Sequence, residues 1–181
     1  MARRAVRKPR LVMVGRAMHE QGIREGGKIG CMEELLAYGL VWDRGLSDGA
    51  AYRAALDKLY GDSESTTGLL LELETVADDS RSTLRMLEEW RLSNEDEFSV
   101  GKFGRALMES LEEAYRSKRY SKEELGKGAY SIWCWLPMEI AAELPFYELC
   151  NIDEYLTSPA HPEGLADEVF EEMFSFYKAR Q

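Results

Sequence analysis

The stretch "VGKFGRALMESLEEAYR", residues 100–116, decides the fold class of this sequence. Its large apolar side chains recur every three or four residues, at Val100, Phe103, Leu107, Leu111 and Tyr115. That spacing places all five on one face of an α-helix, where they can pack against a core. Glu112 and Arg116 stand four residues apart, which adds a supporting ion pair on the same helix. The stretch therefore predicts a long amphipathic helix.

Helical spacing of apolar residues extends from this stretch toward both ends of the chain. It recurs in residues 31–42, 47–61, 67–77, 78–92 and 161–180. A capping box formed by Ser121 and Glu124 indicates the start of a further helix. No alternating apolar and polar run of a length useful for a β-strand follows residue 30. We therefore predict an all-α fold, with a single compact, bundle-like domain of about six to eight helices over residues 29–181.

Residues 130–150, "YSIWCWLPMEIAAELPFYELC", form the densest apolar stretch of the chain. Pro137 suits the first turn of a helix, whereas Pro145 disfavours helical geometry at the residue before it. We expect a helix of about two turns between the two prolines. Fifteen of the 21 residues are apolar or aromatic, which is too many for one exposed face. Most of these side chains are therefore expected in the core.

Two tryptophans in this stretch flank a cysteine. Trp133 and Trp135 cannot point the same way on a helix, so we expect one of them to be partly exposed. Cys134 lies between them and is expected to act as a small buried hydrophobic residue rather than as a nucleophile.

The formal net charge of −10 is divided unevenly along the chain. Residues 1–28 carry eight basic and two acidic side chains, whereas the rest of the chain carries 15 basic and 31 acidic ones. The sequence therefore predicts a basic, largely unstructured N-terminal arm, residues 1–28, followed by an acidic helical domain. The apolar run "LVMV", residues 11–14, could form a short strand but is too short for the apolar region of a secretory signal.

Three interpretations of the basic arm stay open. The arm binds nucleic acid, or it folds back onto the acidic domain, or the functional chain starts at Met32. Lysine and arginine often contact phosphates, but the strongly acidic domain tethered to the arm would repel nucleic acid. We expect no nucleic-acid binding.

The number and spacing of the cysteines and the hydropathy of the chain indicate the cellular compartment expected for the protein. Cys31, Cys134 and Cys150 are odd in number and widely spaced, which is typical of a reduced cytoplasmic chain rather than of a disulfide framework. No apolar run approaches the roughly 18 residues of a membrane span. We expect a soluble cytoplasmic protein that does not contact membranes.

The residues that catalysis requires are scarce. His19 and His161 are the two histidines, and "HEQGI" has Ile23 where a zinc-protease motif needs its second histidine. The glycine-rich residues 20–30 match neither dinucleotide-binding nor phosphate-binding motifs. Acidic pairs four residues apart are numerous, but a solvated helix face produces the same pattern. We expect no catalytic residues, no metal and no cofactor.

Acidic runs remain as the main candidate for function. The predicted partner-binding residues are Glu88, Glu89, Trp90, Glu95, Asp96, Glu97 and Trp135. The sequence favours a small non-catalytic protein that binds a basic protein partner through an acidic helical surface, like an inhibitor, an immunity protein or a nucleic-acid mimic. One alternative is a small all-α enzyme with a pocket near Trp133, Trp135 and His161. Another is a homo-oligomeric structural module.

Overall fold

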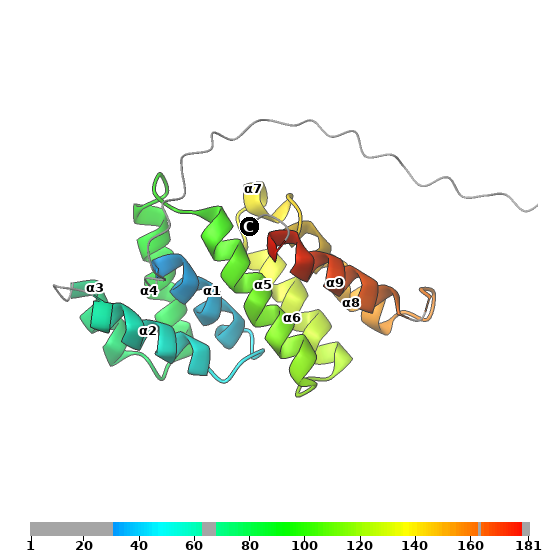
Figure 1. The fold of residues 1–181 in the computed structure, drawn as a ribbon, viewed down its shortest axis with the longest axis horizontal. Helices are drawn as coiled ribbons and strands as arrows, with labels where there is room; N and C mark the ends of the chain where they lie inside the picture. The colour runs from blue at the N-terminus through cyan, green and yellow to red at the C-terminus, as the bar shows by residue number, and fades with distance from the viewer. Residues whose placement is uncertain (1–30, 63–67, 163, 179–181) are drawn as a thin grey trace, which may run out of the picture.

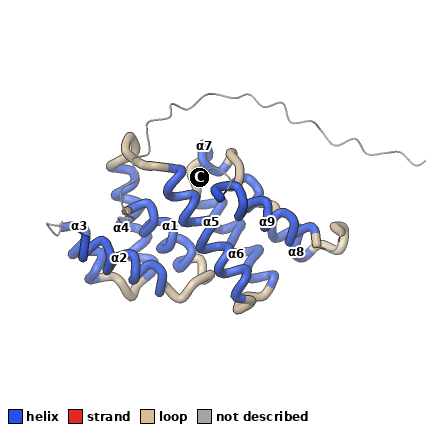
Figure 2. Tube along the Cα trace, in the orientation of Figure 1, coloured by secondary structure: helices blue, strands red, loops and turns tan. Residues whose placement is uncertain are grey.

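The computed structural model describes residues 31–62, 68–162 and 164–178, and within these ranges the chain is helical without strands (Figures 1 and 2). The α-helices are α1 (Met32–Asp43), α2 (Ala50–Asp62), α3 (Gly68–Thr75), α4 (Ser80–Ser93), α5 (Val100–Ser117), α6 (Lys122–Trp135), α7 (Met138–Ala141), α8 (Ile152–Thr157) and α9 (Leu165–Lys178). A 3₁₀ helix, η1 (Phe146–Cys150), precedes α8. The all-α prediction is confirmed. The number of described helices exceeds the six to eight expected, because short helices such as α8 leave no long apolar stripe in the sequence.

Local hydrogen bonds explain where several helices begin. The Asp79 side chain accepts hydrogen bonds from the backbone N–H groups at the start of α4, and the Ser99 hydroxyl does the same for α5. Ser121 and Glu124 form the predicted capping box of α6, with each side chain bonded to the backbone of the other residue. These contacts satisfy N–H groups that have no partner inside the helix.

The core is centred on α1, which packs against α5, α4, α2 and α6 (Figure 1). Leu35, Leu36 and Leu40 of α1 are completely buried. From α5 the predicted stripe contributes Phe103 and Leu107, which are buried, while its two end members are half-buried. The stripe therefore faces the core as predicted.

Two glycines, Gly104 of α5 and Gly126 of α6, allow neighbouring helices to cross at short distance. A Cβ at Gly126 of α6 would lie 2.7 Å from the Cα of Asp153 in α8. A Cβ at Gly104 of α5 would collide with the side chains of Tyr177 in α9 and Phe146 in η1. The absence of a side chain at both positions lets α8 and α9 approach their neighbours.

The prediction for the helix after Pro137 is wrong in length. A helix does begin at Pro137, which is the N-cap of α7 rather than a residue of its first turn, but α7 is a single turn, Met138–Ala141. The N–H of Glu143 already bonds to the carbonyl of Ile140, three residues back, which marks a tightened turn rather than a second α-helical turn. The chain then enters η1 after Pro145.

The burial predicted for Cys134 is also wrong, since its side chain is exposed. The inward face of α6 is occupied by Ala129 and Ile132, and a residue two positions after Ile132 points almost the opposite way. Trp133 and Trp135 flank this direction and are both half-buried against the core. The Trp133 indole N–H donates a hydrogen bond to the carbonyl of Ala141 at 3.1 Å, which ties α6 to α7.

Within the part of the chain that the structure describes, no helix is both long enough and apolar enough to cross a membrane. The predicted basic arm, residues 1–28, and the short strand suggested by residues 11–14 lie outside the described residues.

Candidate functional site

The acidic turn, residues 94–97, connects α4 to α5. Glu95, Asp96 and Glu97 follow one another here and are all exposed. None of the three forms an ion pair with another described residue, although eight ion pairs occur elsewhere in the described ranges. The turn therefore presents three consecutive carboxylates to solvent, and no described residue forms an ion pair with them.

Contacts on both sides hold the acidic turn in place. The Asn94 side chain donates a hydrogen bond to the carbonyl of Trp90 at 2.7 Å. The Trp90 ring meets Phe98 edge-on, with 6.3 Å between ring centroids, across the base of the turn. The Ser99 N–H donates to a carboxylate oxygen of Glu33 at 3.1 Å, and Glu33 is buried in the first turn of α1. The turn is thus fixed to the central helix of the fold.

The other predicted partner-binding residues divide into two groups. Glu88 is half-buried on α4, and Glu89 is exposed, with Arg85 at 3.0 Å from its carboxylate. Leu92, whose side chain is 54% exposed, lies between this part of α4 and the turn and was missed by the sequence analysis. Trp135 belongs to a different part of the molecule, because α6 packs mainly on η1 and α8, whereas α4 packs mainly on α1.

The residues of the enzyme alternative come from α6 and from the loop between α8 and α9. His161 lies in the loop between α8 and α9, where its Nε2 is 3.0 Å from a carboxylate oxygen of Glu154 and its ring meets Tyr155 edge-on. Trp133 and Trp135 occupy the last turn of α6. Among the described residues, no group of three or more histidine, cysteine, aspartate and glutamate side chains is arranged to hold a metal ion.

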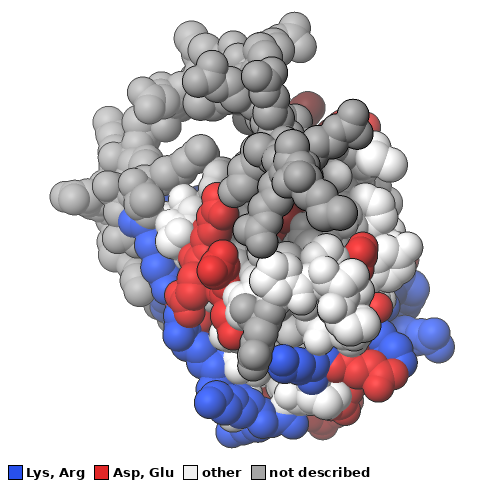
Figure 3. All heavy atoms as spheres, turned by 90° about the vertical axis from the view of Figure 1, so that its right-hand side faces the viewer, with Lys and Arg blue, Asp and Glu red and all other residues white. Residues whose placement is uncertain are grey.

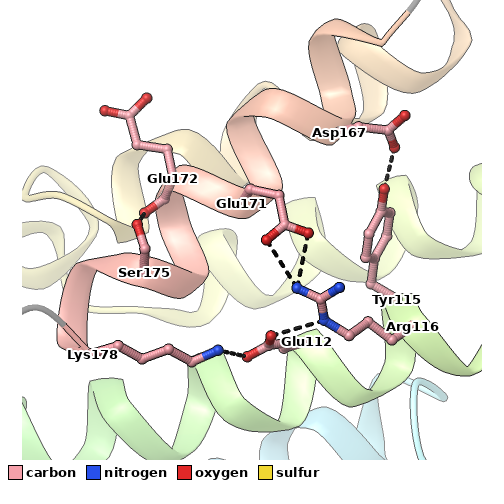
Figure 4. Close-up of polar contacts among 8 residues, drawn as sticks. All are labelled: Glu112, Tyr115, Arg116, Asp167, Glu171, Glu172, Ser175 and Lys178. Carbon is pink, nitrogen blue, oxygen red and sulfur yellow. Dashed lines mark hydrogen bonds and ion pairs between the residues drawn. The ribbon is translucent and has the colours of Figure 1, made fainter.

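A polar seam joins α9 to α5 (Figure 4). Glu112 of α5 accepts hydrogen bonds from Arg116 at 2.8 Å and from Lys178 of α9 at 2.6 Å. Arg116 also donates to both carboxylate oxygens of Glu171, at 2.8 and 2.9 Å. The pair of Glu112 and Arg116 was predicted from the sequence, whereas the contacts that cross to α9 were not. The seam fixes how α9 lies on the domain.

The seam also changes the protonation behaviour of its members. Burial alone would raise the pKa of Glu112, but hydrogen bonds from Lys178 and Arg116 outweigh it and lower that pKa below its ordinary value. The Tyr115 hydroxyl donates to Asp167, and burial together with this hydrogen bond raises the pKa of Tyr115 to about 12. The side chains are satisfied by each other, which is typical of a structural clamp rather than of a reactive centre.

A groove between η1 and α9 is a feature that the sequence analysis missed. Its volume is about 260 Å³. Its walls include the apolar side chains of Leu144, Val169, Met173 and Phe176 and the carboxylates of Glu148 and Glu172. The sequence held part of this signal, because Val169 and Met173 stand four residues apart within residues 161–180, where a helix was predicted. Which helix they would face could not be read from one sequence.

Comparison with known proteins gives this chain no family. No protein-family model, no curated protein and no solved structure matches it.

Proposed function

We propose that this protein is a small, non-catalytic, cytoplasmic interaction protein that binds a basic protein partner through its acidic helical surface. In physical type it resembles an inhibitor, an immunity protein or a nucleic-acid mimic. The observation that carries the proposal is the acidic turn, in which Glu95, Asp96 and Glu97 are exposed and have no ion-pair partner among the described residues.

The contacts that hold the acidic turn in place favour a role of the turn in binding over a role in solubility alone. Ordering a loop on association costs free energy, and a loop that is already ordered avoids much of that cost. Trp90, Phe98 and Glu33 hold the turn before any partner arrives. Complementary charge then accelerates encounter with a basic partner, and the exposed Leu92 offers apolar contact beside the carboxylates. Nucleic acid would be repelled by the same surface.

The test compares two sets of charge removals in the full chain. The first variant carries Glu95→Gln, Asp96→Asn and Glu97→Gln in the acidic turn. The control carries Asp57→Asn, Glu72→Gln and Glu74→Gln at exposed positions of α2 and α3, so its net charge is the same. Binding of each protein to immobilised poly-L-lysine is measured by surface plasmon resonance at several salt concentrations.

We expect the turn variant to bind about five- to tenfold more weakly than the unmodified chain at low salt, since exposed charge contacts contribute about 0.2–1 kcal/mol each. The control variant should lose clearly less affinity for poly-L-lysine. Equal losses would show that only net charge matters and would contradict a site at the turn. Affinity purification from the native cell then identifies the partner, and co-purification of duplex DNA in place of a basic protein would also refute the proposal.

A further inference from the structure

The groove between η1 and α9 has the size of an anchor site for side chains. Its volume of about 260 Å³ is below the roughly 300–1,000 Å³ of small-molecule sites. Leu144 at its edge is 49% exposed, so apolar surface at the mouth remains uncovered by other described residues. Such a groove accommodates one or two apolar side chains of a peptide rather than a cofactor.

Two carboxylates give the groove a preference for cations. Burial, and then the negative charge of Glu172, raise the pKa of Glu148 above its ordinary value. The two acidic groups thus repel each other at the wall of an apolar hollow, and a cation placed between them would relieve the repulsion. Figure 3 faces the end of the molecule that α8 and α9 form, and it shows acidic side chains gathered beside an uncharged area, with lysine and arginine side chains along the left and lower edges of this face.

One segment of the chain combines the two properties that the groove selects. Residues 7–16, "RKPRLVMVGR", place four apolar side chains between Arg10 and Arg16, with Arg7 and Lys8 before them. The apolar run matches the walls of the groove, and the flanking cations match Glu148 and Glu172. We propose that residues 7–16 dock in the groove of the same molecule and compete there with basic sequence from a partner. The proposal rests on the proposed function, because it extends the binding of basic sequence from the acidic turn to this second site.

The chain is long enough for this contact. Fifteen residues separate Arg16 from Met32, the first residue of α1. Fully extended they span about 50 Å, and as a random chain about 20 Å. A domain of this size has a radius of gyration of about 15 Å, so a large part of its surface is within reach. A linker of this kind gives an effective concentration on the order of 1 mM, so even a dissociation constant of about 0.1 mM would keep the groove mostly occupied.

The test uses a fluorescein-labelled synthetic peptide with the sequence of residues 7–16. Its binding is measured by fluorescence anisotropy with the full chain and with an arm variant of the full chain, Leu11→Ser with Met13→Ser. The arm variant is then combined with Glu148→Gln and Glu172→Gln in the groove. The matched control combines it with Glu139→Gln and Glu143→Gln, which remove two exposed carboxylates that do not line the groove. Circular dichroism checks that every variant is folded.

We expect the peptide to bind the arm variant about tenfold more tightly than the unmodified chain, because the tethered segment no longer competes. The groove substitutions should then weaken binding at least fivefold, and the control substitutions should weaken it less than twofold.

Three results would overturn the proposal. Equal affinity for the unmodified chain and the arm variant would show that residues 7–16 do not occupy the groove. Loss of binding in the control as large as in the groove variant would show that the peptide senses only net charge. Absence of peptide binding to any variant, with poly-L-lysine binding retained at the acidic turn, would reject the groove and leave the proposed function intact.

Discussion

At the scale of single residues, the three thiols differ strongly in their environment. Burial, together with the charges of Glu34 and Glu33, raises the pKa of the Cys31 thiol to about 11. Burial and the nearby Glu148 also raise the pKa of Cys150, whose thiol donates a hydrogen bond to the carbonyl of Tyr147 at 3.0 Å. Cys134, in contrast, is exposed on α6.

The alkylation rates of the three thiols should follow their exposure and their pKa. With iodoacetamide at pH 8, we expect Cys134 to react first and Cys31 last, because only about a thousandth of Cys31 is thiolate three pH units below its pKa. Peptide mapping by mass spectrometry over time measures the three rates. In denaturant the rates should converge. If Cys31 and Cys134 react equally fast in the native protein, the burial described for Cys31 is incorrect.

A comparison of two glycines tests the close crossing of α6 and α8. In Gly126→Ala the new methyl group would lie 2.7 Å from the Asp153 Cα, so backbone must move, and we expect unfolding to become easier by about 1–3 kcal/mol. In Gly61→Ala nothing lies within 4 Å of the new methyl group, and the higher helix propensity of alanine should stabilise α2 by up to about 1 kcal/mol. Urea denaturation measures the free energy of unfolding of both variants. If Gly61→Ala destabilised the protein as much as Gly126→Ala, the close crossing of α6 and α8 would not be the cause.

At the scale of helices, the polar seam makes the attachment of α9 depend on pH. The pKa of Glu112 is lower in the folded protein than in the unfolded chain. Its contribution to stability is therefore complete above about pH 4.3, the ordinary pKa of a glutamate, and is lost as the pH falls through the lower pKa of the folded state. Glu112→Gln should reduce stability at pH 7 by about 1 kcal/mol.

The same variant should show a weaker loss of stability between about pH 5 and pH 3 than the unmodified chain, because it lacks this titrating group. Melting temperatures recorded across that range measure the difference. Glu168→Gln, at an exposed position of α9, is the control and should follow the unmodified chain. A parallel acid dependence in Glu112→Gln and the unmodified chain would show that the seam contributes nothing to pH sensitivity.

At the scale of the whole molecule, features set within one helix could be predicted from the sequence. The helix over residues 31–42 and the box of Ser121 with Glu124 depend on neighbours within four residues, so one sequence contains the required information. The inward stripe of α5 follows from spacing alone. The acidic turn could likewise be predicted as a run of charges. The hydrogen bond by which Glu33 holds the turn in place could not.

Features that join distant segments could not be predicted. Arg116 contacts Glu171, 55 residues away in the sequence, and Ser99 contacts Glu33, 66 residues away. The local sequence pattern around one residue does not indicate which distant residue it will contact. The groove has the same origin, because Glu148 and Glu172 come from separate elements whose mutual orientation depends on the packing of α9. Cys134 was misjudged because apolar composition does not reveal which residues of α6 take the inward positions.

The central place of α1 has a consequence for synthesis on the ribosome. α1 is the first described helix to emerge, yet its main partner α5 is complete only at Ser117. At about 5–20 residues per second, the nascent chain waits roughly 4–15 seconds between finishing α1 and finishing α5. During that interval the completely buried leucines of the mature protein are open to water and to chaperones that recognise exposed apolar sequence.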